Sequence, residues 1–485
     1  QNCAVFIDAL DELPKIESKE KALTEIGKFH TKYPKIKIVC SSRPSDYLFH
    51  NCETQGYRYL EIEDLNIAQI TQYLNTYFGE NIIKSKSLLK SLKDSEILDK
   101  LPKTPLSIAL ITILFDEKEV EIPATITDLY EDFVNLLIGK TSIKQTTDII
   151  EKGIKHRILC YIAKSLHSDL KNSILKDDLY KLVTDYATDR GQPFDVNQVL
   201  NEIMDKVGLL YLNDKDEVKF KHQSFQEYFT AFELFHHRQS DRKLFVENFN
   251  DLWWQNVAIF YAGMSKDSPK LIGEILKKSK PEAFHDYISN TAGIGRLLQA
   301  LYNTPIPQRK EGIKRGLENT TSVIKFLIEE DEEYIDFFKN FSKYGLMQIF
   351  GGWFKHNFWS ITLKEPISSL FNEIFQDFNE TDMDKSDLFK FQYHLYLLSS
   401  ILASDSFLEI EQFKMLIDQT TFLDIDVLAI CDTHYKKLLK TLPHEYRNNE
   451  HIKKIKRKLE IKKKSFINME DKVNTTVSKL RLKNT

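Results

Sequence analysis

The sequence predicts a short α/β segment with a parallel sheet, followed by a mostly α-helical chain. Residues 4–7 are all apolar and residues 35–40 contain a second apolar run, as expected of strands buried on both faces of a parallel sheet. Between them, residues 15–32 place apolar side chains at helical spacing among lysines and glutamates. A strand, a helix and a strand at this spacing predict a right-handed parallel crossover. From residue 66 onward the chain reads largely as amphipathic helices.

The composition is that of a globular chain with several cores. Of its 485 residues 42% are apolar and 28% charged, and the net charge of −4 argues against a globally basic nucleic-acid binder. No apolar run approaches the roughly 20 residues that span a bilayer, so no membrane contact is expected. Because the chain opens at Gln1, just before a core strand and without an initiator Met, we expect it to be part of a longer protein. The five cysteines stand far apart without a C-x-x-C pair, which predicts reduced, buried thiols in a cytoplasmic protein: Cys3, Cys40, Cys52, Cys160 and Cys431.

Acidic side chains follow the first predicted strand. Asp8 ends the apolar run, and Asp11 and Glu12 come three residues later. A carboxylate at the C-terminal tip of a parallel strand sits where open α/β sheets bind ligands, and it suits a Mg²⁺ ion that also contacts phosphate. Asp11 or Glu12 would then orient or deprotonate an attacking water. An acidic surface turn after an ordinary strand is the alternative.

Two more residues are candidates for the same site. Arg43 follows the second strand, so we expect it at the same sheet edge as Asp8, where its guanidinium would contact a γ-phosphate. Closing a turn before Pro44 is the alternative for Arg43.

Pro105 precedes an apolar helix and suits its first turn, because the fixed φ of proline is helical and its missing N–H is not needed there. A third strand is predicted at residues 57–62.

Residues 153–235 predict a winged-helix unit. The helix before the wing is acidic rather than basic, which disfavours DNA binding. His222 precedes the next helix, where a simple helix cap is the alternative to a ligand contact. Ser224 and Glu227 are spaced for a capping box. The predicted elements are helices at 154–167, 176–188 and 196–207, strands at 209–212 and 218–221, and a helix after His222.

These stretches, in this order, resemble the NACHT branch of the STAND ATPases. Residues 4–13 have the form of a Walker B motif, residues 41–44 that of sensor 1, and residues 220–229 (FKHQSFQEYF) that of the NACHT winged helix. The fit at Pro105 is partial, because Lys103 stands where the family often has Gly. The resemblance implies a metal ligand at Asp8, hydrolysis by Asp11 and Glu12 with Arg43 as sensor, adenine packing on Pro105, and a contact from His222 to the β-phosphate of ADP.

The resemblance also implies an order of domains. Gly139-Lys140-Thr141 imitates the end of a phosphate loop, but it lacks the first Gly and follows a predicted helix, so we reject it. The phosphate loop is therefore expected upstream of Gln1 or missing, and without it tight nucleotide binding is not expected. The implied domains are the C-terminal part of a P-loop nucleotide-binding domain over 1–65, a helical domain over 66–140, a winged helix over 141–235, a helical sensor region over 236–450 and a basic helical tail over 451–485.

The C-terminal half contains no catalytic constellation. Its aromatic side chains recur at helical spacing, as core residues do, and paired helices of the solenoid type fit the pattern. The resemblance implies a nucleotide-dependent signalling or antiviral defence switch, closed with ADP and open with ATP and Mg²⁺. It would form homo-oligomers when active and sense an unidentified protein trigger through its C-terminal helices. A non-enzymatic helical scaffold and a winged-helix DNA binder are the alternatives.

Overall fold

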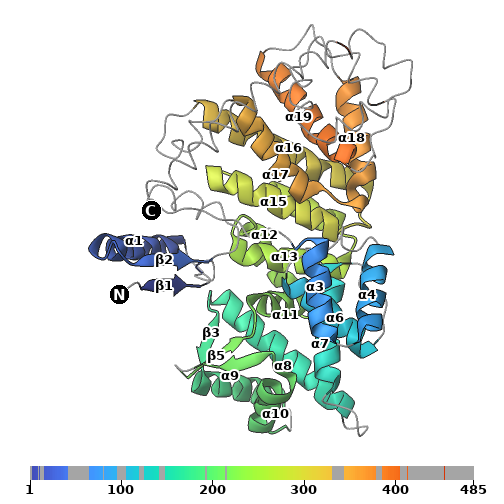
Figure 1. Ribbon diagram of the computed structural model, residues 1–485. Coiled ribbons are helices and arrows are strands. Elements are labelled where there is room, and N and C mark those ends of the chain that lie inside the picture. The colour runs from blue at the N-terminus through green and yellow to red at the C-terminus, as the bar shows by residue number, and fades with distance from the viewer. Residues whose placement is uncertain are drawn as a thin grey trace. The chain divides into compact units, whose positions relative to one another are not determined.

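The computed structural model is mainly α-helical and forms two compact units, Gln1–Gln308 and Arg309–Thr485. Figure 1 shows the elements in their order along the chain. The expected domain boundaries stay predictions. The residues that the structure describes are 3–8, 10, 16–41, 65–79, 81–94, 105–118, 125–140, 148–191, 194–213, 216–329, 343–377, 385–404, 412 and 453.

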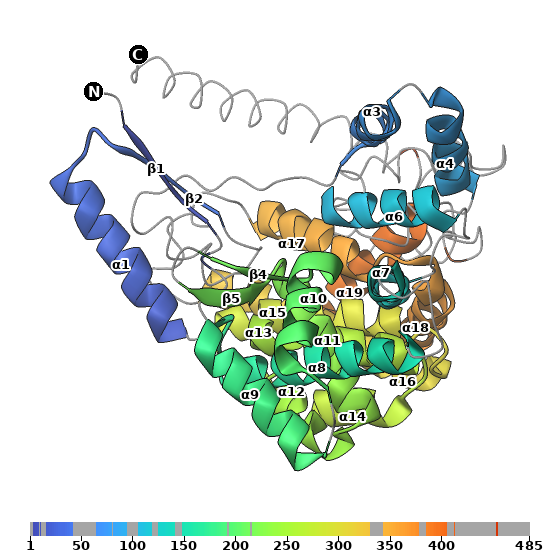
Figure 2. The same ribbon diagram turned by 90° about the horizontal axis from the view of Figure 1, so that it is seen from below.

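A pair of parallel strands opens the first unit. β1 (Ala4–Ile7) pairs with β2 (Lys37–Cys40), and α1 (Ile16–Lys32) connects them. The predicted crossover is therefore confirmed. Figure 2 shows α1 along one side of the strands. On that side Leu10 and Leu23 are buried, with four partly buried residues packed against them: Ile7, Ala22, Ile26 and Cys40.

The other side of this sheet is open, so the prediction of strands buried on both faces was wrong. Phe6 is 77% exposed and Val39, its partner across the strands, is 51% exposed. Side chains alternate along a strand, and α1 covers only the face that carries Ile7 and Cys40. Cys3 is exposed, which also corrects the expectation of a buried thiol at this position.

Four helices follow, α3 (Ile67–Phe78), α4 (Ile82–Asp94), α6 (Pro105–Lys118) and α7 (Ile126–Lys140). Asn66 caps α3 in a reciprocal pair with Gln69, which satisfies two backbone N–H groups at the helix start. Nζ of Lys84 in α4 lies 2.5 Å from a carboxylate oxygen of Asp116 in α6. Gly139 and Lys140 are the last residues of α7, so they continue a helix, as the rejection of a phosphate loop there requires.

The next segment combines helices with a small antiparallel sheet. Its three strands have the order β3-β5-β4, and β3 is the strand that the sequence analysis missed. Nζ of buried Lys155 in α8 lies 2.5 Å from a carboxylate oxygen of Glu202 in α10. Gly208 ends the helical turns in a left-handed conformation (φ +66°) that favours glycine. The elements are α8 (Asp148–Ser168), β3 (Ser173–Leu175), α9 (Lys176–Asp189), α10 (Val196–Glu202), a π-helical turn (Ile203–Val207), β4 (Leu210–Leu212) and β5 (Glu217–Phe220).

α11 (Gln223–His236) is the most buried helix of this region, with eleven buried residues. It packs against α8 on one side and against α13 (Leu252–Ser265) on another. Trp253 and Trp254 of α13 are buried, as their helical spacing with other aromatics predicted. The remaining elements of the first unit are a 3₁₀ turn (Gln239–Arg242), α12 (Lys243–Glu247), α14 (Pro269–Lys278) and α15 (Phe284–Ala300).

The described part of the second unit is helical. Its core is aromatic, and Phe354, Phe358, Phe371 and Tyr393 are fully buried. Among the described residues, none of the helices has the length and apolar character needed to cross a membrane. The elements are most of α16 (Ile306–Glu329), α17 (Lys343–Phe358), a 3₁₀ turn (Ile361–Leu363), α18 (Lys364–Gln376) and α19 (Lys385–Ser404).

Candidate functional site

The C-terminal ends of β1 and β2 bring Asp8 and Ser41 together. The hydroxyl of Ser41 donates a hydrogen bond to the carboxylate of Asp8. Two backbone bonds hold the strand ends in register, from the Ser41 N–H to the Ile7 carbonyl at 2.8 Å and from the Leu10 N–H to the Ser41 carbonyl at 3.0 Å. Asp8 is exposed. An accessible carboxylate with a hydroxyl beside it supplies the hard oxygen donors that suit Mg²⁺.

Three predicted site residues, Asp11, Glu12 and Arg43, lie outside the described residues, as does the predicted strand at 57–62. Their proposed contacts with a nucleotide stay predictions. Within the described part of the chain, no group of three or more His, Cys, Asp or Glu side chains forms a metal-ligand cluster.

Pro105 is the first residue of α6, and it is exposed. Residues 101–104 lie outside the described residues, so its role as a helix start stays a prediction. Contact of Pro105 with an adenine ring stays a prediction.

His222 is the N-cap of α11 and is linked to Tyr130 through Ser224. Its Nδ1 accepts a hydrogen bond from the backbone N–H of Ser224 at 3.2 Å and lies 2.5 Å from Oγ of Ser224. The phenol of Tyr130 in α7 donates to the same Oγ at 2.6 Å. His222 is exposed, whereas Tyr130 is 3% exposed. A buried tyrosine therefore reaches a surface histidine through one serine.

The capping box that Ser224 and Glu227 were expected to form is absent from α11. His222 is the capping residue, because its imidazole nitrogen accepts the N–H that a serine side chain would otherwise satisfy. Ser224 lies inside the helix and its hydroxyl faces Tyr130. Glu227 is buried, and its carboxylate accepts a hydrogen bond from the side-chain amide of Asn256 in α13 at 3.2 Å.

No family model and no curated protein matches this chain.

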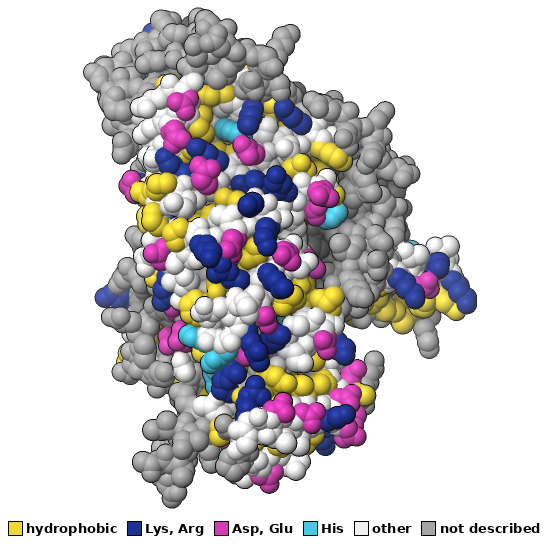
Figure 3. Space-filling model, turned by 180° about the vertical axis from the view of Figure 1, so that it is seen from behind, with side chains coloured by type: hydrophobic (Ala, Val, Ile, Leu, Met, Phe, Trp, Pro, Cys, Tyr) yellow, Lys and Arg dark blue, Asp and Glu magenta, His cyan; other side chains and the backbone are white. Residues whose placement is uncertain are grey.

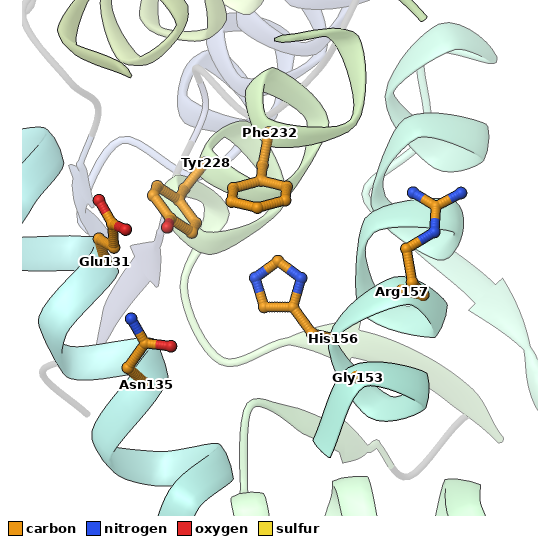
Figure 4. Close-up of a pocket in the computed structure, with 7 residues that line it drawn as sticks. All are labelled: Glu131, Asn135, Gly153, His156, Arg157, Tyr228 and Phe232. Carbon is orange, nitrogen blue, oxygen red and sulfur yellow. The ribbon is translucent and has the colours of Figure 1, made fainter. Parts of the chain in front are cut away.

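A second feature of the first unit is a cavity of about 410 Å³ between α7, α8 and α11, shown in Figure 4. Burial, together with the neighbouring Asp128 and Asp132, raises the pKa of Glu131 on its α7 side. Arg157, on its α8 side, forms an ion pair with the buried carboxylate of Glu233. Sequence patterns carry no signal for this cavity, because its lining comes from three separate helices: Glu131, Asn135, Gly153, His156, Arg157, Tyr228 and Phe232.

The charged side chains on the face shown in Figure 3 are mixed in sign. Lys and Arg alternate with Asp and Glu over the coloured surface.

Proposed function

We propose that this chain is part of a nucleotide-dependent switch of the NACHT type, which binds ADP in a closed state and ATP with Mg²⁺ in an open, oligomeric state. The observation that carries the proposal is the parallel pairing of β1 and β2, which brings Asp8 of the Walker B-like stretch against Ser41 of the sensor 1-like stretch. Ligands of open α/β sheets bind at this end of the strands.

The segment that ends in α11 adds a second line of support. Three helices and an antiparallel hairpin precede α11, and this order of elements supports the proposal of a winged helix. In the proposed closed state, His222 donates from this segment to the β-phosphate. The contact of Nδ1 with the Ser224 N–H does not compete with this role, because the second ring nitrogen, Nε2, is a separate hydrogen-bonding group.

Each strand-end residue has a distinct task in the proposed reaction. Mg²⁺, when bound, neutralises charge on the phosphates. Asp8 holds the metal ion, and Ser41 orients the Asp8 carboxylate by its hydrogen bond. Asp11 or Glu12 positions the attacking water, and Arg43 contacts the γ-phosphate.

The Asp8→Ala substitution tests this proposal. We expect ATP hydrolysis by the full-length protein to fall at least roughly tenfold, because removal of one well-placed catalytic charge costs about that much or more. Glu12→Gln should slow hydrolysis as well. The control is Asp185→Ala, which removes an exposed carboxylate from α9. Unchanged hydrolysis rates in both Asp8→Ala and Glu12→Gln would contradict the proposal.

ATP hydrolysis, thermal unfolding with nucleotide and gel-shift measurements separate the two alternatives. A helical scaffold without enzymatic activity predicts no ATP hydrolysis and no change in melting temperature with ADP or ATP. A winged-helix DNA binder predicts gel shifts with a steep salt dependence. DNA reading by α10 is not favoured by its acidic Glu202, which is already paired with Lys155.

A further inference from the structure

We infer that the cavity between α7, α8 and α11 binds a small organic cation, a primary ammonium group carried on an apolar stem. Three side chains with oxygen acceptors line it, Glu131, Asn135 and Tyr228, and the ring of Phe232 supplies apolar surface. Its volume of about 410 Å³ is in the usual range of small-molecule sites. The cavity lies within the first unit, and the inference does not depend on nucleotide binding.

The hydroxyl of Tyr228 is the observation that calls for an occupant. Tyr228 is 1% exposed, and Figure 4 shows its hydroxyl pointing into the space between α7 and α8. Within the described part of the chain this hydroxyl has no hydrogen-bond partner. Burial, followed by the neighbouring carboxylate of Glu131, raises the pKa of Tyr228, so the phenol keeps its proton. Because buried polar groups are nearly always paired, we expect the occupant of the cavity to supply the partner.

The carboxylate of Glu131 determines the sign of the occupant. Glu131 forms no ion pair with a described residue, since the nearby Lys266 is paired with Asp128 at 2.8 Å. Partial burial, followed by the carboxylates of Asp128 and Asp132, raises the pKa of Glu131. Negative charge on this side of the cavity is therefore poorly compensated, and a bound cation would compensate it.

The guanidinium on the opposite side is already paired. Arg157 in α8 donates to both carboxylate oxygens of Glu233, which is 2% exposed. An anionic ligand would have to compete with this buried carboxylate for Arg157. The described lining therefore has one unpaired carboxylate and no unpaired Lys or Arg, which favours a cation over an anion.

The remaining lining fits an ammonium group on an apolar stem. An ammonium group has three N–H donors and no acceptor. The carboxylate of Glu131, the side-chain carbonyl of Asn135 and the hydroxyl oxygen of Tyr228 offer three acceptors, none of which is used in a hydrogen bond to a described residue. The ring centroid of Phe232 lies 6.3 Å from that of Tyr228 and 4.4 Å from that of His156. Aromatic rings stabilise a nearby cation and pack against its stem.

Titration calorimetry of the full-length protein with phenethylammonium tests the site. Two probes with the same stem are controls: 3-phenylpropionate reverses the charge and 2-phenylethanol removes it. We expect phenethylammonium to bind with a Kd below roughly 1 mM and at least about tenfold more tightly than either control. Nα-acetyl-lysine amide, titrated in the same way, shows whether a free amine or a lysine side chain of a peptide binds better. Equal affinity for phenethylammonium and 3-phenylpropionate, or no binding of either ammonium probe, would overturn the inference.

Glu131→Gln locates the binding, because it removes the charge and keeps the size of the side chain. We expect the affinity for phenethylammonium to fall roughly ten- to hundredfold. The control is Asp132→Asn, which removes the next carboxylate of α7, a residue outside the described lining, and should change the affinity by no more than about fivefold. Wild-type affinity in Glu131→Gln, or an equal loss in both variants, is the result that excludes a direct contact.

Tyr228→Phe separates ligand contact from packing, because the ring remains and only the hydroxyl is lost. We expect the ligand-free variant to keep or gain thermal stability, since no described residue pairs with this hydroxyl, and to bind phenethylammonium roughly three- to tenfold more weakly. Tyr393→Phe, the control, removes a buried hydroxyl that donates to the Met347 carbonyl at 3.1 Å, so it should lower stability and leave binding unchanged. A clear loss of stability in ligand-free Tyr228→Phe, or unchanged affinity for the amine, would show that this hydroxyl does not contact the ligand.

Discussion

His394 in the second unit shows how strongly burial acts on one ionisable side chain. It is 8% exposed, and its Nε2 lies 3.0 Å from Oγ1 of Thr321. Burial, with a smaller effect of Lys390, lowers the pKa of His394 to about 3. The unfolded chain binds this proton at the ordinary histidine pKa, so acid favours unfolding. The stabilisation is complete above about pH 6.5 and is lost as the pH falls toward 3.

His394 should therefore make the second unit less stable in mild acid. Between pH 7.5 and 5.5 we expect its contribution to the free energy of unfolding to fall by about 1 kcal/mol. His394→Gln should flatten this dependence in thermal unfolding followed at several pH values. His356→Gln, which removes an exposed histidine from α17 of the same unit, is the control. An equal slope in the wild type and in His394→Gln would show that His394 titrates normally in the folded state.

At the scale of elements, close contact between α13 and α15 depends on a glycine. A Cβ on Gly293 of α15 would lie 2.5 Å from Cδ of Gln255, far inside van der Waals contact. Gln255 is fully buried, and its Nε2 donates to the carbonyl groups of Phe249 at 3.1 Å and Ser289 at 2.8 Å. Gln255 cannot move away without breaking these hydrogen bonds. Position 293 therefore has no room for a Cβ and requires glycine.

Gly293→Ala should destabilise the first unit. We expect a loss of about 1–3 kcal/mol from overpacking, reduced by the better helix propensity of alanine. Gly273→Ala in α14 is a matched control, since a Cβ there meets nothing within 4 Å and should stabilise the helix by up to about 1 kcal/mol. Thermal unfolding of the two variants measures both changes in stability. Opposite shifts are expected, and stabilisation by both would mean that Gln255 can rearrange.

Periodicity predicted most of the described helices and the two parallel strands, because each is long or apolar enough to carry its own pattern. It missed β3, whose three residues are too few to show a period. It also misjudged Phe6 and Val39, since an apolar side chain in a strand does not reveal whether anything covers it. For α11 the sequence offered two caps, Ser224 in a capping box and His222 as a simple helix cap, and the structure shows His222, because both residue types accept hydrogen bonds and only the backbone decides between them.

For the whole molecule, the candidate site could be predicted only where the pattern of strands and helices itself places its residues. Asp8 follows from the strand, helix and strand pattern and from the Walker B-like stretch, whereas Ser41 was not predicted as a site residue and only the strand end beside it was. The hydrogen bond from Tyr130 to Ser224 could not be found in this way, because 94 positions separate the two residues. Contacts of this range depend on how helices pack, which a single sequence does not specify.

α11 also connects the candidate site to helices farther along the chain. Glu227 accepts from the amide of Asn256 in α13 at 3.2 Å, and the carbonyl oxygen of that amide accepts from Arg296 in α15 at 3.2 Å. Arg296 also donates to the side-chain carbonyl of Gln255. These hydrogen-bonded side chains form a polar chain of Glu227, Asn256, Arg296 and Gln255. The polar chain therefore anchors α11, which His222 caps, on α13 and α15. Such networks fix side-chain positions when every member is satisfied.

Arg296→Ala should loosen this anchor. We expect amide hydrogen exchange over residues 223–236 to become faster, since Asn256 and Gln255 lose a donor in a half-buried site, and ADP to dissociate several-fold faster from the full-length protein. Exchange in β1 and β2 should stay as in the wild type. Lys314→Ala, which removes a cation paired with Glu373 in the second unit, is the control for the loss of a charge. If Arg296→Ala leaves exchange in α11 unchanged, packing alone holds that helix and the polar chain transmits nothing to His222.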